Sequence, residues 1–293
     1  MRMPRGKEFK IRWAGYSLDL DVRTHIMGVL NITPDSFSDG GLYLQRERAI
    51  ERGRAMAREG ADMIDIGGES TRPYSEWVSE EEEMERVIPV IEALKRDTEI
   101  PISIDTCKTG VARRALRAGA SIINDISALR FDPRMAEVAA EAGVPLILMH
   151  MKGTPGDMQD NPTYDALMPE ISDFLKNRIE YAVGKGIKRD MIIVDPGIGF
   201  GKSFDHNLEI IRDLDHLTVL ERPILLGSSR KAFLGHILGR EPMDRDTGTM
   251  ATVTAGILNG ARIVRVHNVK MAVETVKVAD AIRRGRGPEP VTS

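Results

Sequence analysis

The chain has 293 residues, of which 42% are hydrophobic and 29% are charged. This length suits one large α/β barrel or two ordinary domains. The formal net charge of −3 excludes the global basic field typical of nucleic-acid binding. No 18-residue apolar run occurs, the basic N-terminal segment lacks the apolar stretch of a signal peptide, and the single Cys107 excludes an intrachain disulfide. We therefore expect a cytoplasmic globular protein.

The first predicted element is a β-hairpin. Residues 8–21 alternate apolar and polar side chains on either side of Ala14–Gly15, which is a turn signal. We expect this hairpin to precede the main fold and to cover its lower end.

Eight short apolar runs then follow, each four to six residues long and each ending in a polar or glycine-containing loop. Continuous runs of this kind are typical of parallel strands that are buried on both faces. The runs are 26–31, 63–68, 102–106, 122–127, 146–151, 191–196, 224–229 and 263–267.

Longer segments between these runs carry helical signals. Ser79 with Glu82 predicts a capping box at the start of one helix, and Pro89 should kink or shorten that helix. The other predicted helices are 45–59, 108–118, 133–142, 164–184, 204–215, 246–259 and 269–283.

Eight strand–helix units leave two arrangements, a closed (β/α)8 barrel or a doubly wound open sheet. The even count, the regular spacing and the absence of a composition break favour the barrel. We therefore predict one domain over 1–293, with the hairpin at 8–21, a TIM barrel at 23–284 and a disordered tail at 285–293.

Barrel enzymes bind their substrates at the C-terminal ends of the strands, so the residues that end each run are candidates for the site. Nearly every run ends in a group that can titrate or form hydrogen bonds. These groups are Asn31, the turn 67–70, Asp105, Asn124–Asp125, His150, Asp195, Ser228–Ser229 and His267. One such residue alone is most simply a cap or a turn, but eight that converge on one barrel mouth indicate a site.

Three sub-sites follow from the residue types. The first lies at the ends of the last two strands and consists of Arg265, His267 and the segment 228–231. Barrels often bind phosphate at this place, and arginine suits phosphate oxygens. A surface ion pair is an equal alternative. Asp105, Asn124 and Asp195 could accept hydrogen bonds from a purine-like or pterin-like edge. Two carboxylates also fit general acid–base catalysis or a metal site, and the residue types alone do not distinguish these alternatives from binding of such an edge.

The third sub-site consists of two long loops, 31–41 and 67–77, which are rich in Gly, Pro, Ser and Asp. Loops of this length in a barrel are commonly lids or binding segments, and plain surface loops are the alternative.

These loops carry a family resemblance. The segments MGVLNITPDSFSDGG (27–41) and GADMIDIGGESTRP (60–73) are similar to the signature segments of dihydropteroate synthases. The similarity continues in order through SIDT, INDIS, MHMKGTP, DPGIGFGK, HNLEII, GSSRKAFLG and ARIVRVHNV, over roughly residues 26 to 280. His25 and Asn268 depart from the family, which often has proline and aspartate at these two positions.

The resemblance implies a transferase of folate biosynthesis that joins 6-hydroxymethyl-7,8-dihydropterin pyrophosphate to p-aminobenzoate. It implies a Mg²⁺ cofactor and a homodimer through helices late in the barrel. Its catalytic residues would be Asp105, Lys231, Arg265 and His267. The net charge and the short apolar runs already predict no nucleic-acid or membrane partner.

The resemblance also implies binding residues. The pterin would contact Asp105, Asn124, Ile126, Met149, Asp195, Phe200, Gly227 and Lys231. The p-aminobenzoate would contact Thr71, Arg72, Pro73, Phe200, Ser229 and Lys231, with Asp35 and Phe37 as further contributors. The pyrophosphate would contact Asn31, Arg72, Arg265 and His267, and Asn31 would also be a ligand of the magnesium ion.

Three other functions deserve comparison. A pterin-binding methyltransferase would share the barrel and the Asp/Asn pocket, but would not need the 67–73 loop or the cations of the phosphate sub-site. A non-catalytic pterin-binding paralogue would have lost residues such as Arg72, Lys231, Arg265 or His267, and all four are present. An unrelated barrel lyase or aldolase would not bind pterin.

Overall fold

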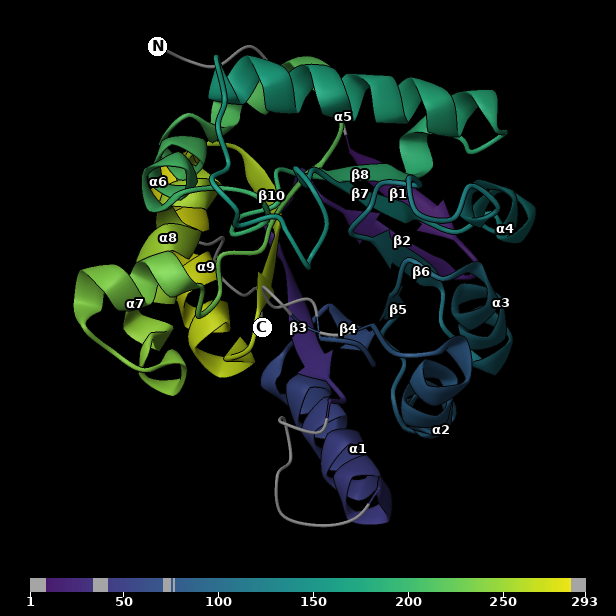
Figure 1. Cartoon of the computed structure of the whole chain (residues 1–293). Helices are drawn as coiled ribbons and strands as arrows, with labels where there is room; N and C mark the ends of the chain where they lie inside the picture. Colours follow the sequence, from purple (N-terminus) through teal and green to yellow (C-terminus); the bar gives the residue numbers. More distant parts are fainter. Residues whose placement is uncertain (1–8, 34–41, 71–74, 76, 286–293) are drawn as a thin grey trace.

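The computed structural model describes residues 9–33, 42–70, 75, 77–285 of the chain. Eight parallel strands close into a barrel in the order β10-β3-β4-β5-β6-β7-β8-β9, and helices surround this ring (Figure 1). The predicted (β/α)8 barrel is therefore confirmed, and the open sheet is excluded.

Each barrel strand lies within or beside one predicted apolar run. The strands are β3 (His25–Asn31), β4 (Met63–Gly67), β5 (Ile102–Asp105), β6 (Ile122–Asp125), β7 (Leu146–Met149), β8 (Ile192–Asp195), β9 (Ile224–Leu226) and β10 (Ala261–Val266). Their apolar side chains are buried on both faces, against the barrel interior and against the helices.

The helices have close to their predicted bounds. They are α1 (Leu42–Glu59), α2 (Glu80–Asp97), α3 (Thr109–Ala118), α4 (Met135–Ala142), α5 (Leu167–Gly184), α6 (Phe204–Arg212), α7 (Ala232–Leu238), α8 (Asp246–Leu258) and α9 (Val269–Arg284). The short helix α7 was not predicted, and the segment predicted as one helix over 204–215 divides into α6 and the 3-10 helix η3 (Leu214–Leu220). Two further 3-10 helices are η2 (Arg189–Met191) and η4 (Pro242–Asp244).

Helix α2 tests the capping and proline predictions. The Ser79 hydroxyl accepts a hydrogen bond from the backbone N–H of Glu82 at 3.1 Å, as an N-cap does. The helix runs through Pro89 to Asp97, so the proline does not shorten it. Burial of the apolar face on both sides of Pro89, including Val87 and Leu94, outweighs the lost backbone hydrogen bond.

The N-terminal hairpin consists of β1 (Lys10–Trp13) and β2 (Tyr16–Asp19), joined at Ala14–Gly15. Both turn residues have positive φ, 42° and 84°, which matches the twist of a two-residue hairpin. Strand β1 contacts η2, which immediately precedes β8, so the hairpin lies at the N-terminal end of the barrel as predicted. Among the described residues, no helix combines the length and apolar character that a membrane span requires.

Candidate active site

The barrel register aligns three of the predicted site residues at the C-terminal ends of the strands. Asn31 pairs with Gly67, Gly67 with Asp105, and Asp105 with Asn124, across four consecutive strands. A Cβ atom on Gly67 would lie 3.7 Å from both Asn31 Oδ1 and Asp105 Oδ2. The glycine therefore leaves an open space that the oxygen atoms of both residues border.

A buried polar network connects β4, β5, β6 and β10 at this mouth. The Arg265 Nε donates to Asp65 Oδ2 at 2.6 Å, and its Nη2 donates to Asp105 Oδ2 at 2.8 Å. The Asn124 amide also donates to Asp65 Oδ2, at 2.9 Å. One fully buried carboxylate therefore orients both the guanidinium of Arg265 and the amide of Asn124.

Asp65 is not among the site residues predicted from the sequence. The available signal was a carboxylate within the apolar run 63–68, two residues before Gly67 and therefore on the same face of the strand. An acid inside a strand that is otherwise apolar indicates a buried partner, because an unpaired buried charge is costly.

The titratable groups of the mouth have strongly shifted pKa values. Burial, together with the negative charge of Asp65, raises the pKa of Asp105 from 3.8 to about 7, although Arg265 opposes the shift. Burial raises the pKa of Asp195 to about 6, and burial with the nearby Arg265 lowers the pKa of Lys231 to about 8. Groups that titrate near neutral pH and converge on one mouth are typical of functional sites.

Asp195 ends β8 and is held by the loop that follows it. Its Oδ1 accepts a hydrogen bond from the backbone N–H of Gly197 at 2.7 Å. Its Oδ2 faces Gly227, where a Cβ atom would lie 3.7 Å away. The amino group of Lys231 lies 4.1 Å from the centre of the Phe200 ring, so this lysine and this aromatic side chain form one wall of the mouth.

The apolar residues predicted to line the pterin slot also come together. Ile126, Met149 and Phe200 belong to one buried cluster that is separate from the main core, and Phe131 packs against it. Cys107 lies in the same cluster, and burial raises the pKa of its thiol, so it is a packed side chain and not a nucleophile.

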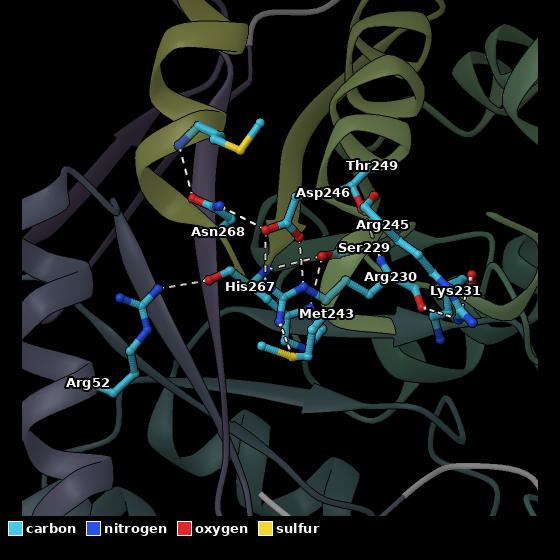
Figure 2. Close-up of polar contacts among 11 residues, drawn as sticks. Arg52, Ser229, Arg230, Lys231, Met243, Arg245, Asp246, Thr249, His267 and Asn268 are labelled. Atoms are coloured by element: carbon cyan, nitrogen blue, oxygen red, sulfur yellow. Dashed lines mark hydrogen bonds and ion pairs between the residues drawn. The ribbon is translucent and has the colours of Figure 1, made fainter. Parts of the chain in front are cut away.

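His267 and Ser229, from the last two strand ends, are in direct contact (Figure 2). The Ser229 hydroxyl lies 2.9 Å from His267 Nδ1, and it also accepts a hydrogen bond from the backbone N–H of His267 at 3.2 Å. Burial, together with the positive charge of Arg230 and Arg265, lowers the pKa of His267 to about 3. The imidazole is therefore neutral at pH 7, so that of His267 and Arg265 only the arginine is a cation.

A second unpredicted group is Lys202, which is 2% exposed. Its amino group lies 2.9 Å from His150 Nδ1 and donates to the Phe200 carbonyl at 2.9 Å. It thereby connects the end of β7 to the loop after β8 that carries Phe200. The sequence offered only a lysine inside the matched segment DPGIGFGK, with no sign that it is buried.

The structure therefore brings together the predicted residues that it describes, on one end of the barrel. Several predicted residues lie outside the described part of the chain, namely Asp35, Phe37, Thr71, Arg72 and Pro73. Of the departures from the family, Asn268 caps α9 by accepting from the Met271 N–H at 3.1 Å, and His25 is buried at the start of β3.

Comparison with known proteins agrees with this geometry. The family model described as pterin binding enzyme matches residues 27–267. The dihydropteroate synthases of Synechocystis sp. and Bacillus subtilis are each 47% identical to the chain, over 91% of it and over 92% and 91% of their own lengths. A folate synthesis bifunctional protein of Arabidopsis thaliana is 48% identical over 92% of the chain, which spans only 51% of that longer protein.

Solved structures are equally similar. Yersinia pestis dihydropteroate synthase in a sulfonamide drug complex superposes with a TM-score of 0.89 at 43% identity, covering 94% of this chain and 100% of that one. Xanthomonas albilineans dihydropteroate synthase with 4-aminobenzoic acid gives a TM-score of 0.88 at 44% identity, covering 94% and 99%. The chain belongs to the pterin-binding enzymes and, among them, to the dihydropteroate synthases, which are transferases of folate synthesis.

Proposed function

We propose that the chain condenses 6-hydroxymethyl-7,8-dihydropterin pyrophosphate with p-aminobenzoate, giving 7,8-dihydropteroate and pyrophosphate. The relatives support this reaction, since a Xanthomonas albilineans dihydropteroate synthase binds 4-aminobenzoic acid in one structure and 7,8-dihydropteroate in another. The observation that carries the proposal is the buried network in which Arg265 joins Asp65 and Asp105 at the barrel mouth.

In this proposal the pterin edge binds Asp105, Asn124 and Asp195, with Lys231 at the oxo or ring-nitrogen side. Carboxylates and an amide match adjacent N–H donors beside a carbonyl. The apolar cluster of Ile126, Met149 and Phe200 provides flat walls for the ring system. Ser229, Lys231 and Phe200 border the p-aminobenzoate, together with Thr71, Arg72 and Pro73, which lie outside the described residues.

The pyrophosphate binds Asn31, Arg72, Arg265 and His267. Two nitrogens of Arg265 are bonded to carboxylates, which orients the guanidinium so that the rest of its fork can face the phosphate side. If Ser229 donates its hydroxyl proton to His267 Nδ1, the neutral imidazole carries its own proton on Nε2 and donates it to a phosphate oxygen. Arg265 then supplies charge, and His267 supplies a hydrogen bond.

The residues present fit a magnesium ion that is shared with the substrate. No group of three His, Cys, Asp or Glu side chains within the described ranges could hold a metal by itself. Mg²⁺ is commonly bound by one or two protein oxygens together with substrate phosphates and water, and Asn31 Oδ1 is such an oxygen at the mouth. Bound there, the ion would neutralise charge that develops on the leaving pyrophosphate.

The reaction follows from these positions. The C–O bond breaks largely before attack, and its electron pair leaves with pyrophosphate, where Arg265 stabilises the developing charge. Ionised Asp105 stabilises the positive charge that spreads over the pterin ring. The lone pair of the aromatic amine then forms the C–N bond, and the amine loses a proton. This amine needs no strong base, so no Ser–His–Asp arrangement is required.

The remaining parts of the proposal concern assembly and location. We propose a homodimer through α8 and α9, where a hollow of about 410 Å³ is lined by Met250, Ala251, Thr254, Glu274, Thr275 and Val278. The cytoplasmic location stays a prediction from the sequence.

The first experiment measures pyrophosphate release by the purified protein with the pterin pyrophosphate and Mg²⁺, with p-aminobenzoate added or withheld. We expect release that depends on p-aminobenzoate, with dihydropteroate formed, and loss of both when EDTA removes the metal. Binding of the pterin pyrophosphate without coupling would instead support the non-catalytic paralogue, and no binding would refute the assigned substrate.

A further inference from the structure

The first turn of α8 holds Arg230, which stands between the predicted site residues Ser229 and Lys231 (Figure 2). Arg230 has a φ of 58°, a left-handed conformation that non-glycine residues rarely adopt and that neighbouring contacts must maintain. The strain therefore lies at the position that sets the directions of the two side chains flanking it.

Contacts from α8, its N-cap and η4 hold the polar groups of Arg230, and the Nη1 of Arg230 lies 3.1 Å from Met243 Sδ in η4. The Thr249 hydroxyl accepts from the backbone N–H of Arg230 at 3.0 Å, and the Arg245 guanidinium donates to its carbonyl at 3.1 Å. The side chain forms a two-point ion pair with Asp246, Nε to Oδ1 at 2.7 Å and Nη2 to Oδ2 at 2.9 Å. Both side chains of that pair are about one-sixth exposed, so solvent screens it less than a surface pair.

Asp246 also contacts the loop after β10. Its Oδ2 accepts a hydrogen bond from the amide of Asn268 at 2.8 Å, and Asn268 directly follows His267. The Asp246 carboxylate is thus hydrogen-bonded to Arg230 on the loop after β9 and to Asn268 on the loop after β10. Arg230 lies between Ser229 and Lys231, and Asn268 follows His267. The Ser229–His267 contact joins these two loops directly.

We propose that Asp246 is a positioning residue, which holds the loops after β9 and β10 in register so that Ser229, Lys231 and His267 face the substrates together. Asp246 itself contacts no reacting atom, and it acts through Arg230 and Asn268. This inference rests on the proposed function, and it deepens that function by adding a residue behind the p-aminobenzoate and phosphate sub-sites.

The chain offers a matched control for this carboxylate. Asp244 stands two residues earlier, is exposed, and its side chain has no role in the contacts described above. Asp244→Asn removes the same charge from the same short segment, so the comparison with Asp246→Asn separates positioning from a general change in charge.

The test is a double-mutant cycle of Asp246→Asn and Ser229→Ala, read as kcat/KM for p-aminobenzoate. If Asp246 acts in part through Ser229, each single change lowers kcat/KM by about tenfold, and the double variant falls by less than the roughly hundredfold product of the two single effects. Asp244→Asn should retain wild-type turnover. Multiplied effects in the double variant, or an Asp246→Asn variant as active as Asp244→Asn, would overturn the proposal.

Two further measurements keep the test decisive. If Asp246→Asn does not fold, Arg230→Lys removes the two-point geometry while keeping the charge, and the same cycle applies. The imidazole 1H–15N resonances of His267, assigned with His267→Gln, report position without turnover. They should move in Asp246→Asn and stay in place in Asp244→Asn, and unmoved resonances would refute positioning even if the wild type proved inactive and the proposed reaction failed.

Discussion

At the scale of single residues, the site depends on charges that are buried in pairs. Asp65 accepts hydrogen bonds from both Arg265 and Asn124, and Arg265 also binds Asp105. A buried charge is tolerated only when it is paired and hydrogen-bonded, so each member of this network restricts the positions of the others. The network therefore sets the direction of the Asn124 amide and both the direction and the protonation state of Asp105, the two groups that we propose to bind the pterin.

The first prediction concerns Asp105. Asp105→Asn removes a carboxylate that, in the proposed function, accepts hydrogen bonds from the pterin, each contributing about 1.5–3 kcal/mol when shielded. Losing about 3 kcal/mol lowers kcat/KM for the pterin pyrophosphate by about 100-fold. Steady-state kinetics measure this, with Asp173→Asn on the outer face of α5 as a control for a lost carboxylate. Turnover close to that of the wild type would exclude the assigned role.

The second prediction concerns pH. Burial and the charge of Asp65 raise the pKa of Asp105 to about 7, so Asp105 is protonated below that pH and ionised above it. Since we propose that the ionised form binds the pterin, kcat/KM for the pterin pyrophosphate should rise as pH increases through about 7. Asp65→Asn removes the repulsion, which lowers the pKa of Asp105 and moves this acid limb to lower pH. If kcat/KM rises at the same pH in the wild type and in Asp65→Asn, the assignment of this rise to Asp105 is contradicted.

At the scale of elements, the loop after β8 shows how a short segment is placed against its neighbour. Gly197 has a φ of 71°, and a Cβ atom there would lie 1.9 Å from the His150 carbonyl oxygen. At the other end of the loop, the amino group of buried Lys202 contacts His150 Nδ1 and the Phe200 carbonyl. Because both groups touch the end of β7, the position of Phe200 follows from the packing of two adjacent strand ends.

The third prediction compares two glycines. Gly197→Ala combines a left-handed backbone with a clash against backbone, so it should lower the free energy of unfolding by about 3 kcal/mol. Gly184→Ala, in the last turn of α5 with no atom near its Cβ position, should raise it by about 0.5 kcal/mol or more. Urea denaturation measures both. Equal effects at the two positions would refute the close approach at Gly197.

At the scale of the whole molecule, closure of the barrel places residues from distant parts of the chain side by side. Arg265 and Asp65 are 200 positions apart, yet their side chains are bonded at 2.6 Å. The outer surface retains exposed apolar side chains on the late helices, namely Leu258, Val278 and Ile282, which are 42%, 61% and 57% exposed. An apolar face of this kind on α8 and α9 supports the proposed dimer.

The fourth prediction tests that dimer. Val278→Glu places a charge in the hollow between α8 and α9, where burying it would be costly, so a dimer at this face should dissociate. Light scattering after size-exclusion chromatography measures the mass. Val219→Glu in η3 is the matched control, because Val219 is also exposed, at 72%, but does not line the hollow. Equal masses for Val278→Glu and the wild-type dimer would exclude this interface.

The sequence alone determined the barrel and the strand ends of the site. Buried parallel strands need continuous apolar runs, and polar residues at their ends therefore identified Asp105, Asn124, Asp195 and His267 as neighbours at one mouth. Local patterns also predicted the hairpin and most of the helices. They did not predict α7, because a helix of seven residues carries too little periodicity to distinguish it from a loop.

Only the tertiary structure decided which side chains pair and which protonation states they have. Asp65, Lys202 and Asp246 contact partner side chains that lie 16 to 200 positions away along the chain. The neutral state of His267 likewise results from burial beside Arg230 and Arg265. Pairing, burial and pKa depend on distances in space, which a one-dimensional pattern does not contain until the barrel closes.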